Sequence, residues 1–133
     1  MNRQQTRAFL DAFIKMRDAL TDQQASMAVD IYPTLKCNNE LIKAGTRIKD
    51  GDVIYKAAVD LWDTAENIPA LAPALWEVLN YKDGYRYIPE VITVTTAFAK
   101  DECGWWEDAL YRSLVDNNVW TPIEHAAAWE KVN

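Results

Sequence analysis

Apolar residues in the first part of the chain recur with the period of a helix. The stripe is spaced alternately by three and four residues and comprises Thr6, Phe9, Phe13, Met16 and Leu20, widened by Leu10 and Ile14. This spacing predicts an amphipathic helix over residues 3–20. The stripe fits packing against another helix of the same chain, and it also fits self-association. Two heptads are too few for a lone coiled coil, but they suffice when further modules add contacts, so self-association predicts a trimer or dimer.

A second helix is predicted directly afterwards. Thr21 and Gln24 have the spacing of a capping box, in which each side chain bonds to the backbone amide of the other residue. Ala25, Ala28, Val29 and Tyr32 then lie on the buried side, and Pro33 ends the helix. Residues 1–32 are therefore predicted to form a helical hairpin.

From residue 45 the period changes to that of strands. Residues 46–49, the turn pair Asp50-Gly51 and residues 52–56 predict a hairpin. Trp105-Trp106-Glu107-Asp108 occupies the corresponding turn later in the chain without its glycine, so that hairpin must differ. The β-branched run Val91–Thr95 predicts another strand, and Lys82-Asp83-Gly84 predicts a hinge.

The chain repeats itself after the helical segment. A shift of 56 residues superimposes Pro33 on Pro89, Ile42 on Phe98, Asp52 on Asp108, Ile54 on Leu110, Tyr55 on Tyr111, Val59 on Val115 and Asp60 on Asp116. The shift then falls to 53, which superimposes Pro69 on Pro122, Ala74 on Ala127, Trp76 on Trp129, Glu77 on Glu130 and Asn80 on Asn133. Residues 32–80 and 88–133 are thus predicted to be two copies of one unit, the first with three extra loop residues. Tyr55, Tyr111, Trp76 and Trp129 are assigned to its core.

Charge and hydropathy exclude several classes of protein. The net charge is -6, and residues 81–133 carry five basic and nine acidic groups. Nucleic acid and anionic membrane surfaces need a basic stripe, so neither is an expected partner. No apolar run approaches the roughly 20 residues that span a bilayer. Asp11, Lys15, Arg17 and Asp18 interrupt any signal-peptide core, which predicts folding in a cytoplasm.

Catalytic and metal motifs are not found in the sequence. Cys37 and Cys103 lack neighbouring metal ligands and are interpreted as free thiols, and His125, the only histidine, as a surface residue. The acidic residues Glu102, Glu107, Asp108 and Asp116 are interpreted as a solvated face rather than a glycosidase pair. We therefore expect no enzyme activity, no cofactor and no metal.

Two segments carry a resemblance to a known family. GTRIKDGDVIYKAAV followed by PALAPALWEVL resembles the family 5/12 carbohydrate-binding modules, the chitin-binding type, and LYRSLVDNNVWTPIEHAAAWEKV resembles them more closely. The resemblance implies an α+β protein, with the helical hairpin (1–32) followed by two small antiparallel β modules (33–80 and 81–133). Leu35 and Val91 stand where the family often has a Trp, so chitin specificity is not carried over.

The resemblance also implies exposed aromatic residues as the ligand surface. A pyranose stacks its apolar face on an indole, while nearby amides and carboxylates bond to its hydroxyls. Trp120, with Asp116, Asn117 and Asn118 before it, fits this description best, and packing of Trp120 under its own loop is the alternative. Because Asn67 replaces Trp120 in the first copy, Trp62 is the candidate there. Trp105 and Trp106 face opposite sides of a strand, so only one can be core and the other is exposed or lies in an interface, and Trp106 is included as a candidate.

A helical hairpin that ends in VDIYP before such modules resembles small structural proteins of tailed bacteriophages and prophages. This implies a virion component of the tail tip, baseplate or head fibre, made in the host cytoplasm. Its expected partners are a host cell-wall or capsule glycan, other phage structural proteins and further copies of itself. One alternative is an assembly protein of the virion whose modules have lost sugar binding. A detached accessory module of a chitinase or lysin is a weaker alternative.

Overall fold

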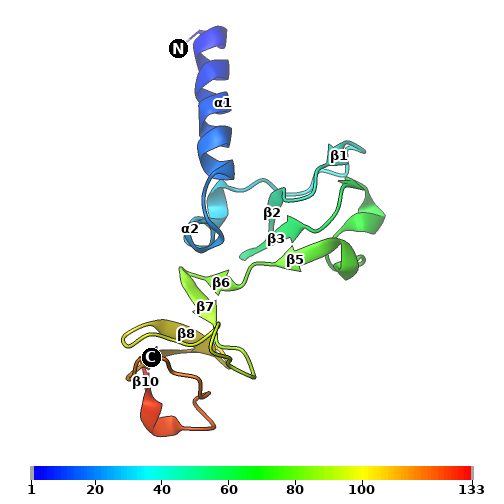
Figure 1. Ribbon diagram of the computed structural model, residues 1–133. Helices are drawn as coiled ribbons and strands as arrows, with labels where there is room; N and C mark the ends of the chain where they lie inside the picture. The colour runs from blue at the N-terminus through cyan, green and yellow to red at the C-terminus, as the bar shows by residue number, and fades with distance from the viewer. Residues whose placement is uncertain (1, 133) are drawn as a thin grey trace. The chain divides into compact units, whose positions relative to one another are not determined.

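The N-terminal helix stands out because none of its side chains is buried. The computed structural model describes residues 2–132, and its first element is the 16-residue helix α1 (Arg3–Asp18; Figure 1). Asn2 and Gln5 cap it, each side chain accepting a hydrogen bond from the amide of the other (2.8 and 2.9 Å). The predicted helix is confirmed, but it ends at Asp18. Since α1 has no buried residue, helix-on-helix packing is the wrong interpretation of its apolar stripe.

The second helix is much shorter than predicted. Helix α2 (Asp22–Ser26) begins at the predicted capping box of Thr21 and Gln24, and the chain then tightens into the 3-10 turn η1 (Val29–Ile31). The predicted helical hairpin is therefore one long helix followed by a short one. The tight turn brings Tyr32 against Ile54 of the neighbouring sheet, where both are buried with Ala25 and Leu79. This small core explains why the chain leaves the helical path before Pro33.

The first sheet is an antiparallel meander. Its order is β2 (Arg47–Asp50), β3 (Val53–Ala57) and β5 (Trp76–Val78). The predicted hairpin is confirmed, although Asp50 pairs with Val53, so the turn residues are Gly51 and Asp52. Gly51 has a φ of 63°, which favours glycine. The remaining elements of this part are β1 (Leu41–Ile42), β4 (Leu61–Trp62), which pairs with β1, and the 3-10 turns η2 (Ala65–Asn67) and η3 (Pro73–Leu75).

The second sheet has five strands. They are β6 (Tyr81–Lys82), β7 (Tyr85–Tyr87), β8 (Cys103–Trp106), β9 (Ala109–Ser113) and β10 (Trp129–Lys131), the last preceded by the 3-10 turn η4 (Ala126–Ala128). Their order is β10-β9-β8-β7-β6, antiparallel except for β7 and β8. Asp83 and Gly84 have φ values of 52° and 86° and form the tight turn between β6 and β7. The prediction of a hinge at Lys82-Asp83-Gly84 is thus wrong.

The two sheets repeat one another in register. Ile48 pairs with Tyr55 as Gly104 pairs with Tyr111, a shift of 56 residues. Ala57 pairs with Trp76 as Ser113 pairs with Trp129, so the shift has become 53 on the closing strand. These registers confirm that the two copies share one fold; Asn133, matched to Asn80 in the sequence, lies outside the described residues. The chain divides into two compact units between Leu79 and Asn80.

The hairpin of the second copy turns without glycine, as its sequence requires. Trp106 pairs with Ala109, so Glu107 and Asp108 are the two turn residues. Their φ values are 49° and 65°, and a tight hairpin turn of type I′ needs two positive values. Glutamate is an unusual residue for this conformation. The different hairpin predicted here is therefore confirmed.

The core of the second unit lies on one face of its sheet. Phe98 and Trp129 meet edge to face with ring centroids 5.1 Å apart, and Ile88, Ile92 and Ala128 complete the buried cluster. Gly104 is needed beneath them, because a β-carbon there would lie 2.7 Å from Ile88 and 2.8 Å from Phe98. Trp76 and Trp129 are buried as predicted, whereas Tyr55 and Tyr111 are only half-buried.

Residues Val91–Thr95 do not form the predicted strand. The amide of Thr93 donates to the Thr96 hydroxyl at 2.8 Å, and the Thr93 and Thr95 hydroxyls lie 2.9 Å apart. These local hydrogen bonds close a turn, which competes with strand pairing despite the β-branched side chains. Val91 and Val94 project into solvent, and only Ile92 enters the core.

The coarse fold class predicted from the sequence is confirmed, because the chain combines a helix with antiparallel sheets. Within residues 2–132, every helix is too short or too polar to cross a membrane.

Candidate functional site

Trp120 presents its indole to solvent from a backbone that is held at both ends. Trp120 is 44% exposed. The Trp120 amide donates to the Asn118 side chain at 3.2 Å, and its carbonyl accepts from the buried Trp129 indole at 2.6 Å. The alternative of a ring packed under its own loop is therefore wrong. A fixed backbone and an exposed ring suit the stacking of a flat apolar ligand.

The three polar residues before Trp120 have different roles. Asp116 and Asn117 are exposed, and Asp116 accepts a hydrogen bond from the amide of Lys100 at 3.1 Å. Asn118 is fully buried, and its amide group donates to the Ser113 hydroxyl and to the Ala128 carbonyl at 3.0 and 3.1 Å. Asn118 is therefore a scaffold residue, which corrects its prediction as a binding residue. A buried side chain with satisfied hydrogen bonds has no group left for a ligand.

The adjacent tryptophans of β8 face opposite sides of the sheet, as predicted. Trp106 packs against the core around Phe98 and Trp129, so its choice as the exposed candidate is wrong. Trp105 is on the other face, where its indole donates to the Lys82 carbonyl at 2.8 Å and the Lys82 ammonium lies 5.0 Å from its ring. Alternation along a strand separates the two rings, but only the register shows that Trp106 is the one packed on the core; both residues are half-buried.

Trp62 is exposed in the first unit, as its candidacy requires. The residue is 55% exposed and lies on β4, where it pairs with Leu41, itself 43% exposed. The indole of Trp76 donates to the Asn67 carbonyl as that of Trp129 donates to the Trp120 carbonyl, so Asn67 does replace Trp120 in the first copy. Trp62 and Trp120 thus belong to different compact units.

His125 was missed as a neighbour of the exposed ring. Its imidazole meets the Trp120 indole edge to face, with centroids 5.4 Å apart and an interplanar angle of 76°. Reciprocal hydrogen bonds between Thr121 and Glu124, at 3.0 and 3.1 Å, fix the turn that carries His125. The spacing of Thr121 and Glu124 is that of a capping box and was a usable signal for this turn.

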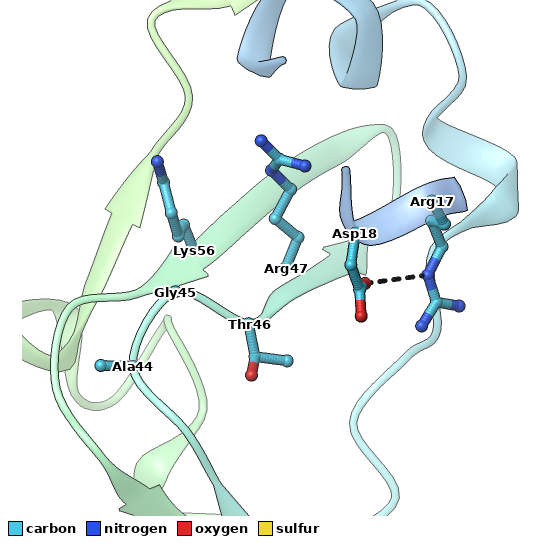
Figure 2. A pocket seen from close by; sticks show the side chains of 7 residues that line it. All are labelled: Arg17, Asp18, Ala44, Gly45, Thr46, Arg47 and Lys56. Carbon is cyan, nitrogen blue, oxygen red and sulfur yellow. Dashed lines mark ion pairs between the residues drawn. The ribbon is translucent and has the colours of Figure 1, made fainter. Parts of the chain in front are cut away.

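The first unit contains a polar hollow of about 480 Å³. Figure 2 shows its lining, in which Arg47 and Lys56 point to the same side and Arg17 pairs with Asp18. The nitrogens of Arg47 and Lys56 lie 2.7 and 3.1 Å from the Asp22 carboxylate. Each basic side chain of the hollow thus has a carboxylate partner within the protein, Arg47 and Lys56 sharing Asp22, and this shared contact joins α2 to the sheet. We assign the hollow a structural role.

Asp22 is the group whose titration this arrangement perturbs. Burial alone would raise the pKa of its carboxyl, but hydrogen bonds from Arg47 and Lys56 and the charges of both outweigh that effect and hold the pKa below its ordinary value of 3.8. A carboxyl whose pKa is lowered on folding stabilises the folded state above the pKa of the unfolded chain. That contribution is lost as the pH falls through 3.8 and below.

We expect Asp22→Asn to lower the thermal unfolding midpoint at neutral pH, with a deficit that shrinks as the pH falls through 3.8 and below and the Asp22 carboxyl of the wild type becomes protonated. Asp30→Asn is the matched control. The Asp30 side chain is 99% exposed, so its pair with Lys49 at 3.5 Å contributes little to stability. Thermal unfolding followed by circular dichroism across pH 2 to 7 measures both variants. A deficit of Asp22→Asn that stays constant over this range would contradict the account.

Residues that could hold a metal ion do not gather in the described part of the chain. Among residues 2–132, no three His, Cys, Asp or Glu side chains are grouped for this. Cys37 and Cys103 are free thiols, as predicted. Neither a protein-family model nor a curated protein matches the chain.

Proposed function

We propose that the protein binds glycans of a host cell surface, without catalysis, through the exposed indole of Trp120. The observation that carries the proposal is an exposed ring on a backbone pinned by Asn118 and Trp129. Such a ring loses little freedom on binding, and the apolar face of a sugar stacks on it. Asp116 and Asn117, exposed on the same loop, supply hydrogen-bonding groups for sugar hydroxyls.

The two β units are proposed to be modules of the family 5/12 carbohydrate-binding type. The proposal rests on the sequence resemblance of each copy, and the repeated three-strand meander is compatible with it. In the same way, the resemblance of the N-terminal third to phage structural proteins leads us to propose a virion component of the tail tip, baseplate or head fibre. Its partners there are other virion proteins.

A single stacked ring gives a weak site, so function requires several copies. One ring and a few hydrogen bonds correspond to a dissociation constant on the order of 0.1 to 1 mM. Several sites on one particle raise the effective affinity without any new contact. The unpartnered apolar stripe of α1 supports self-association as the means of bringing copies together.

A second candidate function is assembly alone. It is favoured by the first unit, where Trp62 lies beside the exposed Leu41 on paired strands. Two adjacent apolar side chains suit a protein contact better than a sugar, because no polar side chain is placed between them. On this view both modules pack against other virion proteins, and neither of them binds glycan.

We expect Trp120→Ala to abolish retention of the protein on host cell walls, and Trp62→Ala to reduce it less. The physical reason is that Trp120 supplies the stacking surface and has polar neighbours on its loop. A pull-down with purified walls measures retention of the oligomeric protein, and Val94→Ala is the control, because Val94 is 87% exposed and lies away from the Trp120 loop in the sequence. Equal retention of wild type and both tryptophan variants would favour assembly alone, as would no retention of the wild type.

A further inference from the structure

The second sheet has an apolar row on the face turned away from its core. Arg86, Gly104 and Trp106 face the core, so their strand neighbours point the other way. Tyr87 pairs with Trp105, Trp105 pairs with Leu110, and the amide of Val132 donates to the Leu110 carbonyl at 2.7 Å. We call the row Tyr87, Trp105, Leu110 and Val132 the outer row. Its two ends are open to solvent, with Tyr87 40% and Val132 50% exposed, whereas Leu110 between them is 8% exposed and already buried.

The equivalent row of the first sheet is covered. The two shifts of the repeat place Ile54 at the position of Leu110 and Leu79 at that of Val132. Ile54 and Leu79 are packed under Ala25 and Tyr32, from the segment that contains α2 and η1. Leu79 is consequently 4% exposed, against 50% for Val132. This sheet face therefore receives a helical apolar segment in one copy of the fold and lacks one in the other.

Helix α1 is an apolar segment without a place to pack. None of its residues is buried, and Phe9 and Met16 are 61% and 48% exposed. It carries four basic and two acidic residues, a net charge of +2 from Arg3, Arg7, Lys15, Arg17, Asp11 and Asp18. Residues 80–133 carry five basic and nine acidic residues, a net charge of -4. The helix and the second unit as a whole are therefore opposite in net charge, although the Lys82 ammonium lies 5.0 Å from the Trp105 ring on the face that carries the apolar row.

We propose that α1 of one copy docks on the outer row of the second unit of another copy. The contact is heterologous, because the helix and the row are different surfaces, and each copy offers both. Copies joined in this way form a chain or a closed ring. In it, α1 of one copy covers the outer row of the next copy, as the segment with Ala25 and Tyr32 covers the equivalent row of the first unit. The inference rests on the self-association proposed above and is independent of sugar binding.

Two double variants of the full chain test the two surfaces one at a time. Phe9→Glu with Met16→Glu removes the helix stripe, and Tyr87→Glu with Val132→Glu removes the outer row. Sedimentation velocity at high micromolar concentration measures their masses, and circular dichroism checks that they are folded. We expect the wild type to associate and each variant alone to remain a monomer of 15.2 kDa. Val94→Glu, a charge placed elsewhere on the second unit, should associate like the wild type.

The mixture of the two variants gives the decisive result. The intact helix of one fits the intact row of the other, so we expect a dimer of twice 15.2 kDa that grows no further. If the outer-row variant associates like the wild type, the inference is wrong while self-association through α1 stands. If the α1 variant still associates, or if the wild type is a monomer, then docking on the outer row and self-association through α1 are both wrong. Two monomeric variants that do not dimerise when mixed also overturn the inference. Retention on cell walls tests sugar binding separately.

Discussion

We expect Trp129→Ala to lower the free energy of unfolding of the second unit by about 3–5 kcal/mol, the usual cost of truncating a buried tryptophan. Trp129 is 6% exposed, meets Phe98 edge to face and donates its indole hydrogen to the Trp120 carbonyl. Its removal opens a cavity in a cluster with only five buried members and leaves that carbonyl without its donor. Since a unit this small has little stability in reserve, the expected result is its unfolding.

Trp120→Ala is the matched control for this substitution, because its ring is partly in solvent and only its backbone takes part in the scaffold. It should cost about 1 kcal/mol or less. Amide resonances of each unit report their unfolding separately, so the loss for Trp129→Ala should be confined to residues 80–132. A variant of Trp129 as stable as that of Trp120 would contradict the assignment of Trp129 to the core.

The second large effect is expected for Arg86→Met. The Arg86 guanidinium donates to the Glu102 carboxylate at 2.8 Å and to the carbonyls of Thr96 and Ala97 at 2.8 and 2.9 Å, and it lies 3.6 Å from the Phe98 ring centroid. Methionine fills similar space but removes the donor of the Thr96 and Ala97 carbonyls, and it leaves the Glu102 carboxylate with only the Ala99 amide as its donor, at 3.0 Å. Because Glu102 is partly exposed, we expect a loss of about 2–3 kcal/mol, below the full cost of a broken buried pair.

Two further variants test the cause of that loss. Arg86→Lys keeps the charge but not the planar fork, so it should recover only part of the stability. Adding Glu102→Gln to Arg86→Met should cost less than the sum of the single changes, because the two residues interact directly. Chemical denaturation of the wild type, Arg86→Met, Glu102→Gln and the double variant provides this double-mutant cycle. Strict additivity would show that Arg86 acts through the Thr96 and Ala97 carbonyls and the Phe98 ring rather than through Glu102.

The repeat was predictable because the same residues perform the same task in both copies. The closing tryptophans Trp76 and Trp129 each donate to a loop carbonyl nine residues earlier, and this contact fixes the loop length between them. The glycine of the first hairpin turn was also visible, but the turn pair was predicted as Asp50-Gly51 and is Gly51-Asp52, a shift of the turn by one residue. Local chemistry therefore indicated which strands pair, but not the exact register of this hairpin.

The errors come from competition that a sequence does not reveal. Threonine hydroxyls close a turn around Thr93 and override a strong strand propensity. Packing of Tyr32 against Ile54 shortens the second helix. Asn118 looks like a binding residue beside Trp120 but is drawn into the scaffold by Ser113 and Ala128. In the first case local side-chain hydrogen bonds decided the outcome, and in the other two a packing contact or hydrogen bonds to residues further along the chain did so.

The central claim is that the exposed indole of Trp120 is the sugar-binding surface. Its most direct test is a nuclear magnetic resonance titration of the nitrogen-labelled protein with oligosaccharides released from the host wall. The six tryptophans give separate indole signals. We expect the Trp120 signal to shift most, the Trp62 signal to shift less, and the signals of the buried Trp76 and Trp129 to remain in place. No indole shift at saturating sugar, or a shift confined to Trp105, would contradict the claim.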